Sequence, residues 1–538
     1  LIENCAEFIY LVRNNIFHGT KTLDQMFGSE QKQRIKVYEM FIRGVVSLFF
    51  LLWLIVDYTS MDKKLKFDRS IEVQDLDYDE SSLRKITNGA LEVYVSLEDG
   101  SVRQAFLFEK KERNGLKKTR LMSNDDLLRF YFRTDIYGYD APPFAVTDSS
   151  DDYLKISSVD ANGNTFHKIF YFEDDNTLLI QDEVEFGSSV VGPIKVDKYF
   201  FRNRNKSIDY GTSFSRDHLA YSMTDDVFND EQLSSVKESE GYQGNWIGYS
   251  QKHFVVAIFD KNSLQQMYLY PPAEGKDLYR FGFEESPTIQ NSLLKTETRL
   301  FLGPKKKNIL ENVAPHFEYN LDLGFVYGIG EFFIVVLNFF YSWVGSWGFA
   351  IVLLTLLFKV VLSPLQIIQL RSMVKMRQLQ PKIQEIQERY KSDRNKLGME
   401  MMQLYKKERF NPFAGCFPLL PQIPIFLAMF WVTREAFEFR GESFLWIPDL
   451  AESDPYLITP VLMGLMMFLS QKLMPKPPQS KGMQAQIAQQ MMVVFPPLLT
   501  LIFIFMPAGV VIYSVINMLL SIIPQAIILN RAVAAENG

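Results

Sequence analysis

One charged residue lies inside an apolar segment that is otherwise long enough to cross a lipid bilayer. Lys359 stands within the mostly apolar run from Trp347 to Pro364. A charge in hydrocarbon costs roughly 2.5–3.5 kcal/mol even on the lenient scales, so a chain keeps such a residue where it faces water or a partner inside the protein. We therefore predict a polar cavity within the membrane around Lys359. The alternative is a lysine that snorkels to the headgroups, since Pro364 is only about 7 Å further along a helix.

Two neighbouring segments carry polar residues at a matching depth. Thr355 and Ser363 lie four positions on either side of Lys359 and share its helix face. Gln422 lies four residues beyond Pro418, where a later apolar segment begins, or about 6 Å into that helix. If the two segments run in opposite directions, Lys359 and Gln422 reach the same inner-leaflet depth.

The last apolar segment adds a third polar face, formed by Ser514, Asn517 and Ser521. Three helices whose polar positions face one another would wall a wet groove and keep these groups away from lipid. The alternative for serine, threonine and asparagine in a membrane is hydrogen bonding between helices, above all for Asn517.

Composition argues against an enzyme, a metal protein or a nucleic-acid-binding protein. The chain has 538 residues, a net charge of −6 and two cysteines, Cys5 and Cys416, which exclude a disulfide framework and a cysteine metal cluster. No HExxH, GxSxG or Walker-type motif is present. The five histidines all lie outside the apolar segments. We therefore expect no catalytic residues, no metal and no cofactor.

The amino-terminal region predicts a membrane anchor. Residues 40–58 combine a basic flank at Arg43, an apolar run and an acidic exit at Asp57 without a small-residue cleavage site, which indicates an uncleaved transmembrane signal anchor. Residues 1–39 are then an amino-terminal tail in the cytoplasm. They are alternatively an upstream extension, with the start codon near Met26 or Met40.

Residues 59–322 predict an antiparallel β sandwich on the outer side of the membrane. Short runs with period-two alternation are separated by Asp, Gly and Asn turns. These runs cover residues 91–97, 102–108, 128–132, 166–172, 178–186, 254–259 and 296–302. Acidic and aromatic residues such as Asp209 beside Tyr210 would suit a sugar site, although such pairs are more often solvated loop residues.

The second half predicts a helical membrane domain. Residues 323–345 resemble an amphipathic helix on the outer leaflet that ends in an aromatic cluster and a turn at Gly345. With the anchor at 40–58, six spans are expected, the others at residues 347–362, 417–437, 456–473, 491–506 and 510–529. Residues 346–530 thus form the core, and residues 531–538 form a short cytoplasmic tail.

The loop charges orient these spans. The block 365–416 has eleven Lys/Arg against five acids, the 471–490 loop has three lysines and no acid, and the 438–455 loop is acidic. Positive loops stay in the cytoplasm, which puts both termini there. Helical spacing in block 365–416 predicts a cytoplasmic hairpin of two helices. Its cations either dock an anionic partner, such as ribosomal RNA or lipid headgroups, or form a solvated face; the candidates are Arg371, Lys375, Arg377, Lys382 and Arg389.

Over residues 325–530 the chain resembles the YidC/Oxa-type membrane protein insertases in motif order and spacing. The stretches that carry this resemblance are Trp347-Gly-Phe-Ala with Thr355, Lys359 and Pro364-Leu; Met376-Arg-Gln-Leu-Gln-Pro381-Lys-Ile; Asn411-Pro with Gly415-Cys-Phe-Pro418-Leu-Leu-Pro-Gln422-Ile-Pro424; Trp446-Ile-Pro-Asp449-Leu with Asp454-Pro-Tyr456; and Pro507-Ala-Gly509-Val with Tyr513. The outer domain is similar in position and size to the periplasmic β-supersandwich of Gram-negative members, which resembles sugar-mutarotase folds. The fold class expected is therefore an α+β membrane protein, with six spans, a cytoplasmic helical hairpin and this periplasmic domain.

The resemblance implies a hydrophilic groove, open to the cytoplasm and to lipid, that receives a polar segment of a nascent membrane protein. Lys359 stands where the family usually has arginine, and lysine is a point charge without bidentate geometry. The groove residues expected to contact the client are Lys359, Thr355, Gln422, Tyr513, Ser514 and Asn517.

The resemblance also implies a bacterial inner-membrane location and a set of partners. These are nascent membrane proteins, the SecYEG translocon, the ribosome and membrane lipids. Two rival classes of protein carry other sequence features. A secondary transporter usually shows inverted repeats, and none is evident here. A sugar-active envelope enzyme needs paired carboxylates in the outer domain, which sequence alone does not pair.

Overall fold

The computed structural model describes residues 80–537 with several gaps. These gaps are residues 112–114, 123–129, 189–192, 204–217, 223–227, 233–235, 237–238, 262, 272–277, 391–392, 409, 411–418, 474–493 and 495. The predicted tail at 1–39, the anchor at 40–58, both cysteines and the pair Asp209–Tyr210 lie outside the described residues.

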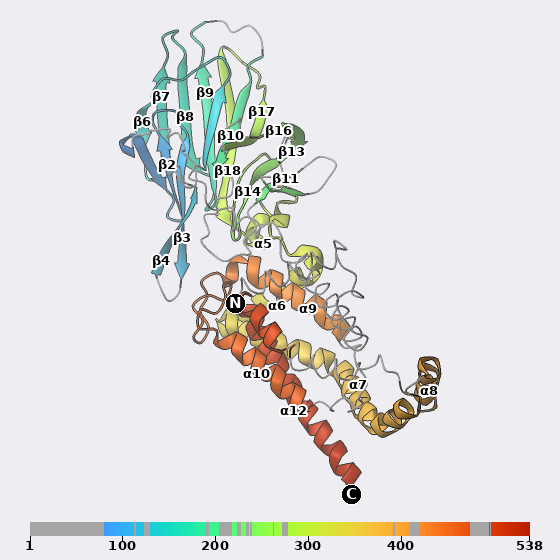
Figure 1. The fold of residues 1–538 in the computed structure, drawn as a ribbon. Coiled ribbons are helices and arrows are strands. Elements are labelled where there is room, and N and C mark those ends of the chain that lie inside the picture. Colours follow the sequence, from blue (N-terminus) through green and yellow to red (C-terminus); the bar gives the residue numbers. More distant parts are fainter. Residues whose placement is uncertain are drawn as a thin grey trace, which may run out of the picture.

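The polar half forms an antiparallel β sandwich of two sheets, which confirms the prediction (Figure 1). In spatial order, the first sheet contains β1 (Leu83–Thr87), β2 (Leu91–Ser96), β3 (Val102–Lys111), β5 (Tyr131–Ile136), β10 (Val196–Asn203), β17 (Leu278–Glu285), β16 (Gln265–Tyr270) and β13 (Glu240–Gly244), with β4 (Gly115–Met122) paired to β3. The second contains β12 (Asn229–Glu231), β11 (His218–Tyr221), β14 (Trp246–Ser250), β15 (Phe254–Phe259), β18 (Leu293–Pro304), β9 (Thr177–Glu185), β8 (Thr165–Phe172), β7 (Tyr153–Val159) and β6 (Ala145–Ser149).

Strand β15 explains how the sandwich joins the rest of the molecule. All six of its residues are buried, unlike the alternating residues of β7, because β15 is covered on both faces. Phe254, Val256 and Ile258 belong to the core between the sheets. The intervening Val255, Ala257 and Phe259 belong to a second core that continues into the helices.

A short linker carries this second core from the sandwich to the membrane half. It consists of a turn of helix and two 3-10 turns, α5 (Lys307–Leu310), η3 (Phe317–Asn320) and η4 (Gly324–Val326). Leu310 and Phe317 are fully buried, and Phe317 packs edge-to-face on Trp246 and on Phe301 of the second sheet. The linker is therefore a packed joint between the two halves.

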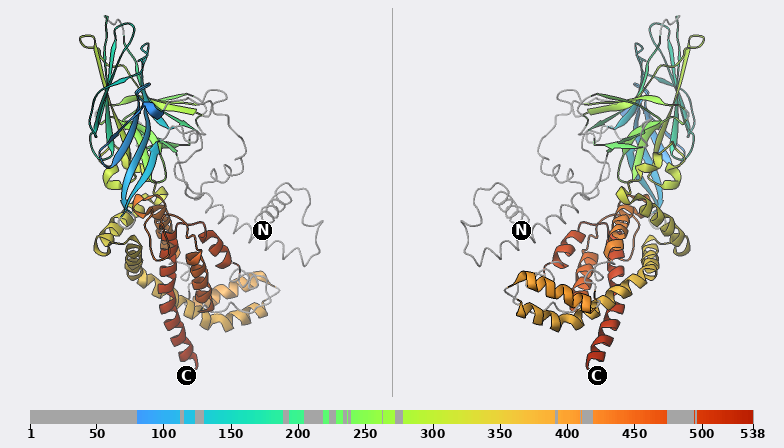
Figure 2. Two further views of the ribbon diagram at one scale, coloured as in Figure 1. Left: turned by 90° about the vertical axis from the view of Figure 1, so that its left-hand side faces the viewer. Right: turned by 90° about the vertical axis from the view of Figure 1, so that its right-hand side faces the viewer.

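The apolar half is helical, and both views in Figure 2 place it at one end of the sandwich. Its described elements are α6 (Tyr327–Val344), α7 (Trp347–Arg389), α8 (Arg394–Lys407), α9 (Leu419–Glu435), η6 (Phe437–Phe439), α10 (Ile458–Leu473) and α12 (Ala508–Asn537). Residues 327–344, 347–376 and 508–528 are long and apolar enough to cross a membrane. An antiparallel β sandwich and apolar helices together make an α+β membrane protein, whereas the count of six spans stays a prediction.

Two details differ from the sequence expectation or refine it. The predicted second span and the first hairpin helix form one continuous helix, α7, which contains Pro364 and Pro381 and bends on its way to α8 (Figure 1). Helix α6, which we expected to lie on the membrane surface, also has the length and composition of a span. Gly345 ends α6 in the left-handed conformation, with φ of 61°, as the predicted turn requires.

The far part of α7 packs against α8. Leu379 and Ile383 of α7 form a small core with Leu404 of α8 and with Phe410. Lys382 Nζ lies 2.6 Å from Glu408 Oε1 across the same contact. The two predicted hairpin helices therefore contact each other, and their cytoplasmic location stays a prediction.

Candidate functional site

Helix α12 brings the predicted polar faces together, because it packs against α7, α9 and α10. Lys359 comes from α7, Gln422 from α9, and Tyr513, Ser514 and Asn517 from α12. Two separate contacts, Lys359–Ser521 and Gln422–Tyr513, thus join distant parts of the chain about 12 Å apart along α12.

Lys359 is half-buried and points toward α12. Its Nζ donates a hydrogen bond of 2.6 Å to Ser521 Oγ, which lies 162 positions further along the chain. The Ser521 hydroxyl in turn donates to the Asn517 carbonyl at 2.8 Å, which fixes its lone pairs toward the lysine. Among the residues that the structure describes, no carboxylate lies within 4 Å of Lys359 Nζ. The contact directs the ammonium to a neighbouring helix, and a neutral hydroxyl leaves its charge uncompensated.

A second polar contact joins α9 to α12. Gln422 Nε2 donates to Tyr513 Oη at 2.7 Å. Gln422 is half-buried, whereas Tyr513 is only 2% exposed. The amide and the phenol therefore satisfy one another between helices, as polar groups in an apolar bundle must.

The two short hydroxyl side chains of the predicted set lie differently. Thr355 and Ser514 are buried, and each donates to the carbonyl four residues earlier in its own helix, Ile351 at 2.7 Å and Val510 at 2.8 Å. They add no described contact with Lys359 or Gln422. Asn517 is half-buried and contributes its backbone carbonyl to Ser521.

The predicted hairpin cations fall into three groups. Lys382 is paired with Glu408, and Arg389 is paired with Glu385 at 2.7 Å on an exposed face. Arg371 is exposed and Lys375 is half-buried. The side chain of Arg377 lies outside the described part of the chain. Part of this basic surface is therefore neutralised within the protein.

Sequence reasoning missed a polar pair between α10 and α12. Gln525 is 4% exposed; its Oε1 accepts from Ser470 Oγ at 3.2 Å and its Nε2 donates to the Ser470 carbonyl at 3.3 Å. A glutamine within an apolar segment is itself the signal that would have found it.

Sequence reasoning also missed a group of buried ion pairs between the sandwich and the helices, which we call the junction cluster. Its members are Lys252, Lys305, Arg434, Glu435 and Glu452. Lys252 Nζ lies 2.6 Å from Glu452 Oε1, Lys305 Nζ lies 3.6 Å from Glu435 Oε2, and Arg434 Nε donates to Glu435 Oε1 at 2.7 Å. Lys252 and Lys305 are 1% and 0% exposed. Three cations thus share two carboxylates, because Lys305 and Arg434 both lie beside Glu435.

The chemistry available to the bundle is electrostatic. Over the described residues, no group of His, Cys, Asp or Glu side chains could hold a metal ion. Lys359, Ser521, Gln422 and Tyr513 offer donors and one positive charge, which suits attraction of an acidic or polar segment.

Comparison with known proteins covers both halves. Residues 84–336 match the family model described as YidC periplasmic domain, and residues 339–535 match that described as 60Kd inner membrane protein. Over 384 residues the chain is 36% identical to a protein of Francisella tularensis subsp. novicida named "Membrane protein insertase YidC", covering 68% of each. A protein of the same name from Saccharophagus degradans is 38% identical over 326 residues, 59% of this chain and 58% of that one.

Among solved structures, a putative aldose 1-epimerase from Escherichia coli K12 is similar to part of this chain. The similarity covers 41% of this chain and 99% of that one, with 9% sequence identity and a TM-score of 0.26.

Proposed function

The chain belongs to the YidC/Oxa family of membrane protein insertases, and we propose that it draws a polar client segment into the membrane through the charge of Lys359. It is an inner-membrane protein with a periplasmic domain, and its activity is insertion rather than catalysis. The observation that carries the proposed mechanism is the half-buried Lys359 ammonium, which has a hydroxyl partner and no carboxylate within 4 Å among the described residues.

The uncompensated charge lowers the cost of bringing an acidic segment into the bundle. Two unit charges about 4 Å apart attract by roughly 4 kcal/mol at an effective dielectric constant of 20. That is enough to offset much of the cost of taking one carboxylate out of water, which is roughly 2.5–3.5 kcal/mol on the insertion scales. A client with a short acidic outer tail is therefore the best substrate of this mechanism.

The apolar part of the client leaves sideways into lipid. Ile423 on α9 and Leu501 and Phe505 on the segment before α12 are 51–56% exposed and offer an apolar path. Partition of the client's own apolar segment into hydrocarbon drives this step. The step needs no nucleotide.

The proposal includes the topology and the groove predicted from the sequence. Six spans, both termini in the cytoplasm, a cytoplasmic hairpin at residues 365–416 and the domain boundaries given above remain part of it. The periplasmic assignment of the β sandwich and the basic block at 365–416 support it. Use beside the SecYEG translocon and contact of the exposed Arg371 with the ribosome are further parts of the proposal.

The test is rescue of insertion in cells depleted of the native insertase. Three variants, Lys359→Arg, Lys359→Ala and Lys359→Glu, are compared with the wild type on a single-span client with a short acidic outer tail. Arginine keeps the charge and should support insertion, whereas alanine and glutamate should reduce it by about tenfold or more, the equivalent of one lost charge interaction. Lys472→Ala is the matched control, because Lys472 is exposed at the end of α10 and lies over the Phe468 ring.

A second client tests whether the charge of residue 359 or the hydration of the groove promotes insertion. The same client with a neutral tail should depend little on residue 359. Full rescue by Lys359→Ala with the acidic client, at equal protein level, would show that Lys359 only snorkels, and the groove would then act through hydration alone.

A further inference from the structure

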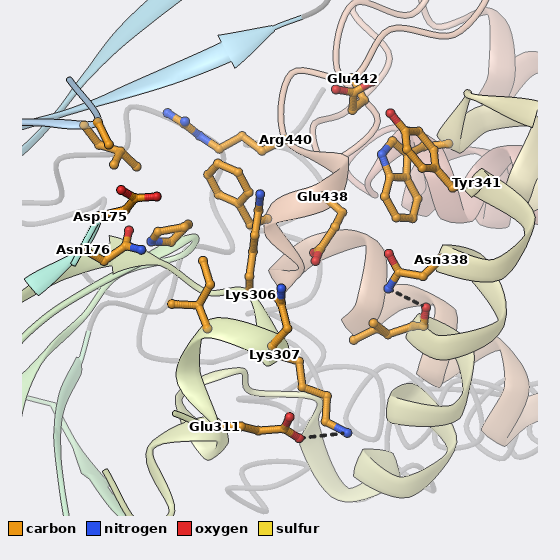
Figure 3. Close-up of a pocket in the computed structure, with 18 of the residues that line it drawn as sticks. Asp175, Asn176, Lys306, Lys307, Glu311, Asn338, Tyr341, Glu438, Arg440 and Glu442 are labelled. Atoms are coloured by element: carbon orange, nitrogen blue, oxygen red, sulfur yellow. Dashed lines mark hydrogen bonds and ion pairs between the residues drawn. The ribbon is translucent and has the colours of Figure 1, made fainter. Parts of the chain in front are cut away.

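A cavity lies at the junction of the sandwich and the helices, remote from the contacts of Lys359. Its volume is about 770 Å³, within the roughly 300–1,000 Å³ typical of small-molecule sites. The turn between β8 and β9, the start of α5, one face of α6 and the segment at and after η6 line it (Figure 3). Four separate elements therefore converge on one space.

A cation and a carboxylate face this cavity without a charged partner. Lys306 Nζ lies 4.8 Å from the centre of the Phe437 ring, and Glu438 comes from the opposite wall, on η6 (Figure 3). Within the described part of the chain, neither side chain has an oppositely charged group within 4 Å. Burial raises the pKa of Glu438, and the Lys306 charge opposes that shift. Both groups are half-buried, so each loses water without gaining an ion pair.

Two neighbouring cations, Lys307 and Arg440, already have other partners. Lys307 pairs with Glu331 and with Glu311, the latter at 3.3 Å. Arg440 lies over the Phe254 ring at 4.7 Å and donates to Thr119 Oγ1 at 3.4 Å. Asp175 and Glu442 also line the cavity, but Asp175 is exposed to water. Lys306 and Glu438 are therefore the half-buried cation and carboxylate that we consider for a ligand.

The surroundings of the cavity favour a position near the outer lipid headgroups. Above it stands the periplasmic sandwich. Below it, Tyr341 of α6 stacks on Trp347 of α7 with ring centroids 4.4 Å apart, and such aromatic pairs favour the membrane interface. Val335, which lines the cavity, continues into an apolar strip on α6 with Phe332 and Phe339, and all three are more than half exposed.

We propose that this cavity binds the headgroup of an aminophospholipid of the phosphatidylethanolamine type. The phosphate meets Lys306, the primary ammonium donates to the Glu438 carboxylate, and the acyl chains lie along Val335 and Phe339. A purely anionic lipid satisfies Lys306 and places a second negative charge near Glu438. A zwitterionic headgroup gives Lys306 a phosphate partner and Glu438 an ammonium partner.

The ligand-side test uses the wild-type full chain. The protein is reconstituted in nanodiscs of mixed lipids, released, and the retained lipids are counted by native mass spectrometry. Phosphatidylethanolamine should be retained over phosphatidylglycerol, which lacks the ammonium, and over phosphatidylcholine, whose trimethylated nitrogen cannot donate. Equal retention of all three would overturn the proposal. Competition by soluble glycerophosphoethanolamine as strong as that by the lipid would show that a free phosphate ester, rather than a membrane lipid, is the ligand.

The protein-side test uses matched variants. Glu438→Gln and Lys306→Gln should each lower retention of phosphatidylethanolamine roughly tenfold, as expected for one charge-assisted hydrogen bond. Lys295→Gln, which removes an exposed lysine of β18, should leave retention unchanged. Unchanged preference for phosphatidylethanolamine in Glu438→Gln would refute recognition of the ammonium by the carboxylate. Because this readout is lipid binding and not insertion, failure here is distinguishable from failure of the proposed function.

Discussion

The molecule treats buried lysines in two opposite ways. At the junction cluster, Lys252 and Lys305 are almost fully buried and each faces a glutamate. Within the helical bundle, Lys359 is half-buried and faces the hydroxyl of Ser521. The same side chain is thus neutralised at the outer joint and left charged inside the bundle.

The two kinds of lysine should have different roles, one in folding stability and the other in insertion. A buried ion pair costs much to break, because one partner is left as an unpaired charge. A cation without a counter-charge contributes little to folding and keeps its field available to a ligand. The junction cluster should therefore control stability, and Lys359 should control insertion.

The largest expected effect comes from removing a junction cation. Lys305→Met leaves Glu435 with one cation fewer at the carboxyl end of α9, where the helix dipole also disfavours a negative charge. Because Arg434 still pairs with Glu435, we expect the free energy of unfolding to fall by about 2–3 kcal/mol. Urea titration of the detergent-solubilised full chain measures it.

Lys359→Met is the corresponding substitution within the helical bundle. Lys359→Met should leave the free energy of unfolding unchanged or slightly raised, because it removes a desolvated charge, while insertion of the acidic client is lost. Loss of stability in Lys359→Met similar to that in Lys305→Met would break the distinction between the two lysines.

A double-mutant cycle gives the next effect. Lys252→Met combined with Glu452→Gln should show a coupling energy of about 1.5–3 kcal/mol, as for hydrogen bonds to charged groups. The matched cycle of Lys359→Met with Ser521→Ala should show about 1 kcal/mol or less. Equal coupling energies in the two cycles would show that the hydroxyl holds Lys359 as firmly as a carboxylate does.

Acid should weaken the junction before it affects the bundle. Burial, with the nearby charges of Lys252, Arg440 and Lys305, holds the pKa of His253 well below its usual value of 6.5. The unfolded chain therefore takes up a proton below about pH 6.5 that the folded chain refuses, and stability falls as the pH drops. Between about pH 6.5 and 5.5 we expect a loss of about 1 kcal/mol. Urea titrations at several pH values measure this loss, and His253→Gln, if it folds, should remove this part of the decline.

The smallest effect concerns the second polar contact of the bundle. Tyr513→Phe removes the acceptor of Gln422 and should lower the free energy of unfolding by about 0.5–1.5 kcal/mol. Insertion measured in the depletion assay should change less than in Lys359→Ala. A larger defect in insertion than that of Lys359→Ala would show that the contact of Tyr513 with Gln422 matters more to the client than Lys359 does.

Local pattern predicted the sandwich, seven of its strands and most of the helical segments, but not the other strands. Alternation in runs such as residues 166–172 follows from one buried and one exposed face, and it placed β8. The polar faces of α7, α9 and α12 were found for the same reason, since each is a periodic feature of one segment. The contact between Lys359 and Ser521 also follows a face predicted from spacing.

Pairing between distant segments could not be predicted in this way. The partners Lys252 and Glu452 are 200 positions apart, and nothing local identifies either as the other's partner. Lys305 lies in a run of three lysines, residues 305–307, and nothing in that run marks it as the fully buried one. Pro364 suggested an end to a helix that α7 passes through, because one proline can bend a helix without ending it.

The junction cluster also sets a height. Lys305 lies next to the end of β18, and this strand runs 12 residues from the joint toward the far tip of the sandwich. At about 3.3 Å per residue it spans about 40 Å. Buried ion pairs and a shared core fix the lower end of the sandwich, so the sandwich is rigidly attached to the helical bundle. Any molecule that binds the turn between β7 and β8 is therefore held at a constant distance above the bilayer, whatever client passes below.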